Sequence, residues 1–202
     1  MNMSTSEAVV ASVESEAEQT VGRIQEEIWI LQAQQADEEV FYVLVNRFDR
    51  RLLYYLTRFT NNTEEALDVA QDVWLRVFRG LTKLHSPGRF RAWLYRIAHD
   101  SVVSRIRHQV REDQILEQLS SEQDVATADP DPITGDPEQV HQALSALSPA
   151  YREVLILRFF EVMSLDEIAH SLRCNPGTVK SRLHYAKQAL KHELENSHEQ
   201  KP

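Results

Sequence analysis

Apolar side chains recur every three or four residues along most of this chain, the spacing that places them on one face of an α-helix. The strongest run lies within residues 37–59, a shorter one within 25–34, and two more within 66–79 and 90–106. No stretch alternates apolar and polar residues in the way a half-buried strand does. The pattern therefore predicts an all-α protein.

The helical pattern breaks over residues 111–137, which end in Asp-Pro-Asp-Pro and Gly-Asp-Pro. Prolines and aspartates of this kind favour a flexible connection. We therefore expect two small helical domains, over residues 26–110 and 138–195, joined by a flexible acidic linker, and each should need its own core. In this division, residues 1–25 are an acidic N-terminal extension and residues 196–202 are a tail.

One predicted helix, which a capping box of Asn62 and Glu65 opens, is apolar on two sides. Its first apolar side consists of Ala66, Val69, Ala70, Val73 and Val77. Its charged side consists of Glu65, Asp68, Asp72, Arg76 and Arg79. Four further apolar residues lie beside these charges: Leu67, Trp74, Leu75 and Phe78. A helix of this kind either lies within a core or docks on a partner.

Near the C-terminus, a short helix, a tight turn and a longer helix follow one another. Residues 164–167 form a capping box that opens the short helix, 175–177 make the turn, and Thr178 is expected to cap a helix that runs to Leu194. This order is typical of a helix-turn-helix, whose second helix enters the major groove of DNA. A solvated basic helix in a bundle is the alternative, and it does not explain the order of the motifs.

The net charge of -9 is unusual for a DNA-binding protein, so the position of the charges matters. Residues 1–36 carry a net charge of -5 and residues 111–137 carry -7, whereas 37–110 carry +3 and 138–202 are balanced. Both acidic blocks lie largely outside the segments predicted to fold. The total charge therefore does not exclude a surface that meets phosphate.

The residue types give little support to an enzyme. With only five glycines, neither a Gly-rich phosphate loop nor a dinucleotide fingerprint can be drawn, and no His-Glu-x-x-His motif exists. Cys174 is the only cysteine, which fits helix packing better than a zinc site built with scattered histidines. We expect no catalytic residue, no metal and no cofactor. The acidic N-terminus and the lack of a membrane-length apolar run predict a cytoplasmic protein without membrane insertion.

Both halves resemble the extracytoplasmic-function (ECF) group of bacterial RNA polymerase sigma factors. The resemblance covers residues 26–110 and 138–195, in the order found in that family. Five stretches carry it: EALDVAQDVWLRVF over 65–78, FRAWLYRIA over 90–98, LSPAYREV over 147–154, SLDEIA over 164–169 and GTVKSRL over 177–183. A helix-turn-helix alone would be weak support for this family, because many regulators carry one.

The resemblance implies a sigma factor that binds core RNA polymerase and directs promoter recognition and strand opening for a stress or envelope-signal regulon. Its implied partners are the clamp region of the largest polymerase subunit, promoter DNA and an anti-sigma factor. The implied polymerase-binding residues are Asp68, Gln71, Asp72, Leu75, Arg76 and Phe78. The alternative for the charged members is that they form only surface ion pairs.

Two sets of residues are implied to contact the promoter. The minus-ten set is Lys83, His85, Arg89, Arg91, Trp93 and Arg96. Cations there would meet the backbone and an aromatic ring would stack on an exposed base, although Trp93 fits a core position at least as well. The minus-thirty-five set is Thr178, Lys180, Ser181, Arg182, His184, Tyr185, Lys187 and Gln188.

Three features depart from the family pattern. Asp100 stands where the family commonly has Asn, which replaces a donating and accepting amide by a carboxylate that only accepts. Tyr185 stands where Arg is frequent, so one expected DNA contact is missing. The acidic N-terminal extension has no counterpart. The acidic linker has two interpretations: a strand that imitates a phosphate backbone within polymerase, or a solvated tether.

A different class of protein also remains open. A stand-alone helix-turn-helix regulator would use residues 26–110 as a sensor or dimerisation domain. Association with core polymerase separates this hypothesis from a sigma factor.

Overall fold

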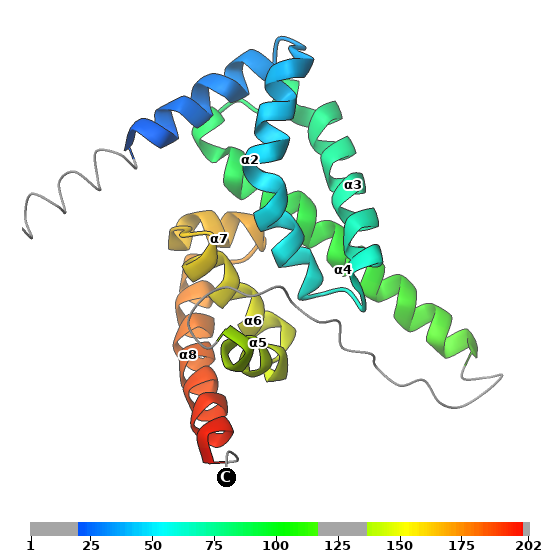
Figure 1. Ribbon diagram of the computed structural model, residues 1–202, viewed down its shortest axis with the longest axis vertical. Coiled ribbons are helices and arrows are strands. Elements are labelled where there is room, and N and C mark those ends of the chain that lie inside the picture. The colour runs from blue at the N-terminus through cyan, green and yellow to red at the C-terminus, as the bar shows by residue number, and fades with distance from the viewer. Residues whose placement is uncertain (1–19, 117–136, 200–202) are drawn as a thin grey trace, which may run out of the picture.

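The computed structural model describes residues 20–116 and 137–199, and every regular element in these two ranges is helical. In Figure 1 the helices of the first half lie above and those of the second half, with the long α8, lie below. The all-α prediction is confirmed for the described residues. The predicted linker lies mostly outside them.

The first half of the chain begins with a helix over residues 20–33. It continues with α2 (Glu38–Thr57), α3 (Thr63–Gly80), the short 3-10 turns η1 (Leu81–Lys83) and η2 (Pro87–Arg89), and α4 (Phe90–Leu116). The sequence specifies two of the helix starts directly, because the Asp37 side chain accepts a hydrogen bond from Val40 N and that of Asn62 accepts one from Glu65 N. Helix α4 runs six residues into the segment predicted to be linker.

The second half consists of α5 (Pro137–Ala146), α6 (Pro149–Leu155), the π-helical turn η3 (Ile156–Phe160), α7 (Leu165–Ser171) and α8 (Pro176–Glu199). The predicted capping box is confirmed: Ser164 Oγ accepts from Glu167 N, and the Glu167 carboxylate accepts from Ser164 N. The predicted cap at Thr178 is wrong. Helix α8 already begins at Pro176, a residue suited to the first turn because its missing N–H is not needed there, and Thr178 N donates to Asn175 O.

The two halves share one hydrophobic core instead of building two separate ones. Buried residues of α2 and α4, such as Leu52 and Leu94, belong to the same packed cluster as Val154, Ile156 and Ile168 of the second half. The difference from the sequence expectation has a physical cause. Three of the four helices of the second half, α5, α6 and α7, have only 7 to 10 residues, and α7 packs against α4 as well as against α8.

Candidate nucleic-acid and protein interfaces

Helix α3 turns one apolar side into the core and leaves the other exposed. Leu67, Leu75 and Phe78 keep 52%, 45% and 50% of their surface accessible, although they belong to a helix whose opposite side is buried. The four polar residues predicted to bind polymerase, Asp68, Gln71, Asp72 and Arg76, are exposed as well. All six predicted residues thus lie on accessible surface of one helix.

The structure corrects the assignment of two residues of α3. The sequence pattern places Glu65 on the charged side, but it is buried, and its carboxylate accepts from Arg105 Nε at 2.5 Å and from Asn61 N at 2.8 Å. The pattern places Trp74 with the outer apolar residues, but it is buried too, and its indole N–H donates to Asp49 at 2.8 Å. Both residues lie at the borders of the core stripe, where a partner on a neighbouring helix satisfies the buried polar atom.

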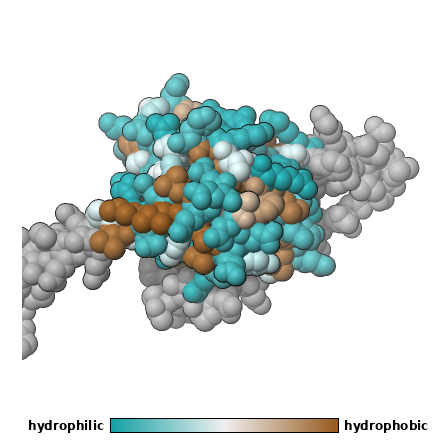
Figure 2. All heavy atoms as spheres, turned by 90° about the horizontal axis from the view of Figure 1, so that it is seen from above, coloured by the Kyte–Doolittle hydropathy of each residue, from teal (hydrophilic) through white to brown (hydrophobic). Residues whose placement is uncertain are grey.

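Further exposed apolar residues lie outside the surfaces predicted from the sequence. Tyr42 and Val43 are exposed on α2, next to Phe41, whose ring contacts Phe78 edge-on with centroids 5.1 Å apart. The helix over residues 20–33 exposes a stripe at three- and four-residue spacing, and Figure 2 shows apolar surface beside the grey residues that precede this helix. This stripe consists of Val21, Ile24, Ile28 and Leu31. The helical spacing of this stripe is visible in the sequence. The sequence alone does not show whether such a stripe faces the core or the solvent.

The loop between α3 and α4 is held by the end of the first helix. Gln34 Nε2 donates to the carbonyl oxygens of Leu81, at 2.9 Å, and Leu84, at 2.6 Å. Three of the predicted minus-ten residues, Lys83, His85 and Arg89, are exposed on this loop. The loop therefore presents these side chains from a backbone fixed by two hydrogen bonds.

The start of α4 is less accessible than the assignment of Arg91 and Arg96 to the minus-ten set implies. Arg91 is largely covered: it donates to Glu26 Oε2 at 3.3 Å and to the Glu161 carbonyl at 3.1 Å. Arg96 is half-buried. The sequence could not show this, because Glu161 reaches Arg91 only through the packing of the second half on the first.

Trp93 is half-buried and packs against the core. Its ring approaches Gly80 so closely that a Cβ there would lie 3.0 Å from a ring carbon, and its centroid is 6.1 Å from that of Phe90. This packing agrees with the core alternative for Trp93. The absence of a side chain at Gly80 is what lets the ring approach the end of α3.

Helix α8 presents the predicted minus-thirty-five residues to solvent. Val179, Leu183 and Ala186 are buried, which fixes the orientation of the helix. Thr178 and Arg182 are half-buried at the flanks of the outward face. Its exposed members are Lys180, Ser181, His184, Tyr185, Lys187 and Gln188. Cations and hydrogen-bonding groups on one open helical face suit phosphates and base edges.

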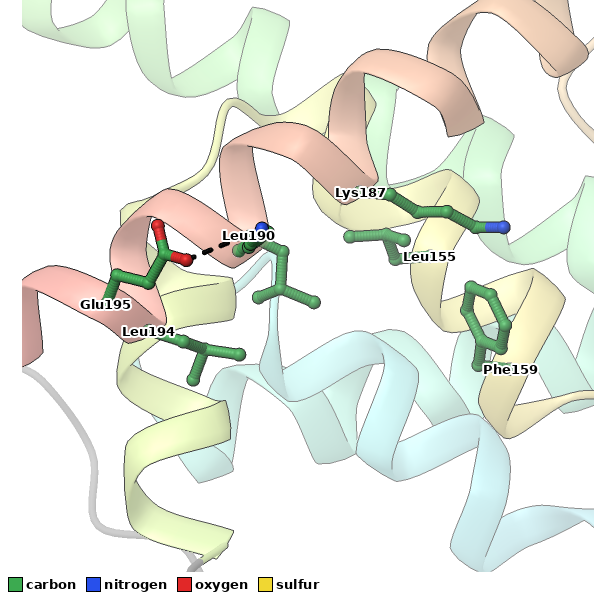
Figure 3. A pocket seen from close by; sticks show the side chains of 7 residues that line it. Leu155, Phe159, Lys187, Leu190, Leu194 and Glu195 are labelled. Atoms are coloured by element: carbon green, nitrogen blue, oxygen red, sulfur yellow. Dashed lines mark ion pairs between the residues drawn. The ribbon is translucent and has the colours of Figure 1, made fainter. Parts of the chain in front are cut away.

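An open apolar groove of about 450 Å³ lies beside this face, between α6, η3 and the second half of α8. Figure 3 shows Lys187 lying above Phe159, with its ammonium nitrogen 5.4 Å from the centre of the ring. The Lys191 ammonium lies 3.6 Å from the Glu195 carboxylate at the other end. The apolar lining consists of Leu155, Phe159, Leu190 and Leu194. No local sequence pattern predicts this groove, because its two walls are far apart in the sequence.

Asp100, where the family commonly has Asn, takes part in the contact between the halves. Its carboxylate oxygen lies 2.5 Å from the Arg173 guanidinium, which belongs to the turn after α7. Arg173 has φ of 51°, an uncommon backbone state for a residue with a long side chain. The departure at Asp100 thus supplies a charge to an ion pair that an Asn would make only as a neutral hydrogen bond.

The part of the chain that the structure describes holds neither a metal-binding cluster nor a membrane-length helix. No group of three or more His, Cys, Asp or Glu side chains in these residues is arranged to hold a metal ion. None of the helices described is both long and apolar enough to cross a membrane. Cys174 is half-buried, and burial is the main cause that raises the pKa of its thiol.

Both halves of the chain match known family models, and most of the chain is similar to known proteins. Sigma-70 region 2 matches residues 44–112, and Sigma-70, region 4 matches residues 138–190. The RNA polymerase sigma factor YlaC of Bacillus subtilis is 32% identical over 162 residues, which cover 78% of this chain and 93% of YlaC. The RNA polymerase sigma-H factor of Pseudomonas aeruginosa is 29% identical over 184 residues, covering 82% of this chain and 92% of that factor.

Solved structures resemble the chain over most of its length. CnrH, solved in complex with the cytosolic domain of CnrY, is 25% identical with a TM-score of 0.62, and the match covers 85% of this chain and 97% of CnrH. The sigma factor RpoE, solved with the anti-sigma factor NepR from Bartonella quintana, has a TM-score of 0.66 at 24% identity, over 77% of this chain and 96% of RpoE. This second likeness shows the fold alone.

The two sigma-70 regions match in the order of the family, and further relatives of the chain are named ECF sigma factors. The chain belongs to the ECF group of bacterial RNA polymerase sigma factors, whose members bind core polymerase and direct it to promoters.

Proposed function

We propose that this sigma factor uses three separate surfaces at initiation. The exposed face of α3 docks on the clamp region of the largest polymerase subunit. The loop after α3 and the start of α4 contact the minus-ten element where the strands separate, and the outward face of α8 contacts the minus-thirty-five element. The chain supplies recognition and strand opening in the cytoplasm, for a stress or envelope-signal regulon, while polymerase supplies the catalysis.

The exposed side of α3 is the observation that carries this proposal. Leu67, Leu75 and Phe78 expose about half of their surface in a helix that already has a buried apolar side. Large exposed apolar groups flanked by charges are typical of a protein interaction site. In a stand-alone regulator this surface would have to serve dimerisation, whereas the match of residues 44–112 to Sigma-70 region 2 favours polymerase as the partner.

A second class of partner is an anti-sigma factor. The structural relative RpoE was solved in complex with such a factor, NepR. In this chain an anti-sigma factor would cover the outer face of α3 and the groove between α6 and α8, because both are apolar and both are accessible. Covering them would keep the chain from polymerase.

Reconstituted transcription tests the proposed function. The chain is mixed with bacterial core polymerase and a library of genomic promoter fragments, and the 5′ ends of the transcripts are mapped. We expect new start sites that share a minus-ten and a minus-thirty-five element. Tight duplex binding by the chain alone, with no association with core enzyme and no transcript, would instead support the stand-alone regulator.

The docking surface has its own test. We expect the double variant Asp72→Ala with Leu75→Ala to bind core polymerase roughly tenfold more weakly or worse, because interface energy concentrates in a few central residues. Glu27→Ala with Ile28→Ala is the matched control, since it also removes one exposed acid and one exposed aliphatic side chain. Equal affinity of the two double variants for core polymerase would exclude the α3 surface.

A further inference from the structure

A buried carboxylate of the second half is held by two helices of the first. Glu153 on α6 keeps 7% of its surface accessible. One of its oxygens, Oε1, accepts a hydrogen bond from the Tyr55 hydroxyl of α2 at 2.5 Å and lies 2.8 Å from Nδ1 of His99 on α4. Three helices therefore meet at a single oxygen atom, and one of the residues that meet there, His99, can change charge near neutral pH.

Protonation of His99 is favoured in this arrangement. The pKa of His99 is raised above 6.5, first by its hydrogen bond to Glu153 and then by the charge of Glu153 and that of Asp100, while burial and the nearby Arg173 lower it by less. These groups and the Tyr55 hydroxyl are the titratable or charged neighbours that face His99 from α2, α4, α6 and the turn after α7. A protonated His99 donates to a carboxylate, which is a stronger bond than a neutral imidazole makes.

A second buried carboxylate lies at the other end of the contact. Glu161, which follows η3, is 1% exposed, and its Oε2 has no hydrogen-bond partner among the described residues. Burial raises the pKa of Glu161 above 4.5, while Tyr95 and Arg91 of α4 and Arg51 of α2 lower it by less. A proton on Glu161 removes the charge that burial penalises. Closing the halves therefore favours proton uptake here too.

The contact between the halves covers the start of α4. Ser171 Oγ donates to the Ala92 carbonyl at 2.9 Å, and Arg91 donates to the Glu161 carbonyl at 3.1 Å. His170 lies close enough to Arg89 and Arg96 that their charges, after burial, lower its pKa. The second half thus covers part of the minus-ten set, at the start of α4 where Arg91 lies, while Lys83, His85 and Arg89 stay exposed. His170 is exposed and works in the opposite direction from His99, so it serves as a control.

We propose that the contact between the two halves is a proton-dependent latch: His99 and Glu161 take up protons as the halves close, so that acidification favours a closed chain in which the α4 part of the minus-ten surface is covered. The last part of this inference, what the covered surface would bind, rests on the proposed function. The latch itself rests only on the contacts that α2 and α4 make with α6, α7 and the segment after η3 that holds Glu161.

The direction of the pH dependence follows from linkage. A group whose pKa is raised by closure stabilises the closed chain fully below its open-chain value, and that stabilisation is lost as the pH rises through the raised value. For His99 the loss begins above 6.5, and for Glu161 it begins above 4.5. Both groups act with the same sign. The closed chain is therefore favoured at low pH and the open chain at high pH.

Fluorescence energy transfer on the full chain, without polymerase or DNA, tests the latch. Dyes are attached at Asn46→Cys on α2 and Gln142→Cys on α5, two exposed positions, in a Cys174→Ala background. Between pH 8 and pH 6 we expect the ratio of closed to open molecules to rise severalfold. A ratio that does not change with pH over this range would overturn the proposal.

Three variants identify the groups involved. His99→Gln removes the step near neutral pH, and Glu153→Gln removes it too, because the amide still accepts from Tyr55 but carries no charge. Glu161→Gln closes the chain at a higher pH than the parent, since no charge has to be buried. The control His170→Gln keeps the step. Parent-like pH profiles in His99→Gln and Glu153→Gln would contradict the latch, and circular dichroism establishes that each variant is folded.

A second arm separates the latch from the proposed function. Single-stranded DNA that carries a mapped minus-ten element is added at pH 6, where the chain is closed. We expect it to shift molecules to the open state and His99→Gln to need severalfold less DNA for the same shift. If the energy-transfer step follows pH but the DNA opens nothing, the latch stands and the assignment of the minus-ten surface fails.

Discussion

The outward face of α8 and the start of α4 both carry cations assigned to promoter DNA, yet their environments differ. Lys180 and Lys187 on α8 are exposed, and neither ammonium group is bound to a carboxylate in the described structure. Arg91 on α4 is bound to a carboxylate of the first helix and to a carbonyl of the second half. One surface is ready to meet phosphate, whereas the other must first give up contacts within the protein.

An unpaired cation and a paired cation differ in how much free energy they gain from a phosphate contact. A free cation gains the whole energy of a phosphate contact and of the counterions released with it. A cation already paired gains only the difference between its two partners. We therefore expect the two surfaces to bind DNA in sequence: α8 can bind the chain to duplex DNA as it stands, and α4 only after the halves separate.

Removing cations from α8 should have the largest effect on DNA binding. We expect Lys180→Ala with Lys187→Ala to weaken binding of the free chain to duplex promoter DNA about tenfold or more, and to lower the salt dependence by roughly two counterions. Fluorescence anisotropy at several salt concentrations measures both quantities. The matched control is Arg91→Ala, which should leave duplex binding at the parent level. A large loss of duplex affinity with Arg91→Ala would show that the cations of α4 contribute to duplex binding as those of α8 do.

The helices and the α8 face were predictable from the sequence because each depends on residues close together in the chain. The capping box at Ser164 and the apolar spacing of Val179, Leu183 and Ala186 fixed both the start of α7 and the face of α8 that stays outside. The exposed face of α3 was likewise predictable in outline. A helix side that mixes charged and apolar side chains cannot be buried in the core of its own protein without burying charge, so it is expected to stay accessible.

The covered start of α4 was not predictable in this way. Arg91 and Glu161 are 70 positions apart, and Tyr55 and Glu153 are 98 apart. No local pattern marks such pairs, since a glutamate on a helix border reads as a surface residue. The acidic residues Glu65, Glu153 and Glu161 are all buried for this reason: each belongs to a contact made between elements.

Arg91 should affect stability where the α8 cations do not. We expect Arg91→Ala to lower the free energy of unfolding by about 1–2 kcal/mol, because it breaks two hydrogen bonds of a charged group and leaves the Glu161 carbonyl without that donor. Lys180→Ala should change the stability by less than about 0.5 kcal/mol, as is usual for exposed sites. Urea unfolding followed by circular dichroism compares them. Equal effects would remove the distinction between a bound and a free cation.

The residue after Glu161, which accepts a hydrogen bond from Arg91, has a strained backbone conformation. Val162 is exposed and has φ of 53°, a left-handed state that disfavours a β-branched side chain. We expect Val162→Gly to raise the free energy of unfolding by about 0.5–1 kcal/mol, since glycine removes the strain and loses part of the gain to its chain entropy. Val140→Gly, in the regular helix α5, should instead destabilise by about 1 kcal/mol. The same sign in both variants would contradict a strained Val162.

The smallest effect is expected at Asp100, where the contact between the halves reaches the solvent. Asp100→Asn leaves a hydrogen-bond acceptor for Arg173 but removes the charge, and an exposed ion pair contributes at most about 1 kcal/mol. We therefore expect a loss of about 0.5 kcal/mol at low salt that disappears at high salt, because salt screens an exposed pair but not the buried bond of Tyr55 to Glu153. Thermal unfolding of parent and variant at two salt concentrations measures this. A loss of stability that persists at high salt would contradict this expectation. It would mean that the ion pair of Asp100 with Arg173 behaves like a buried contact.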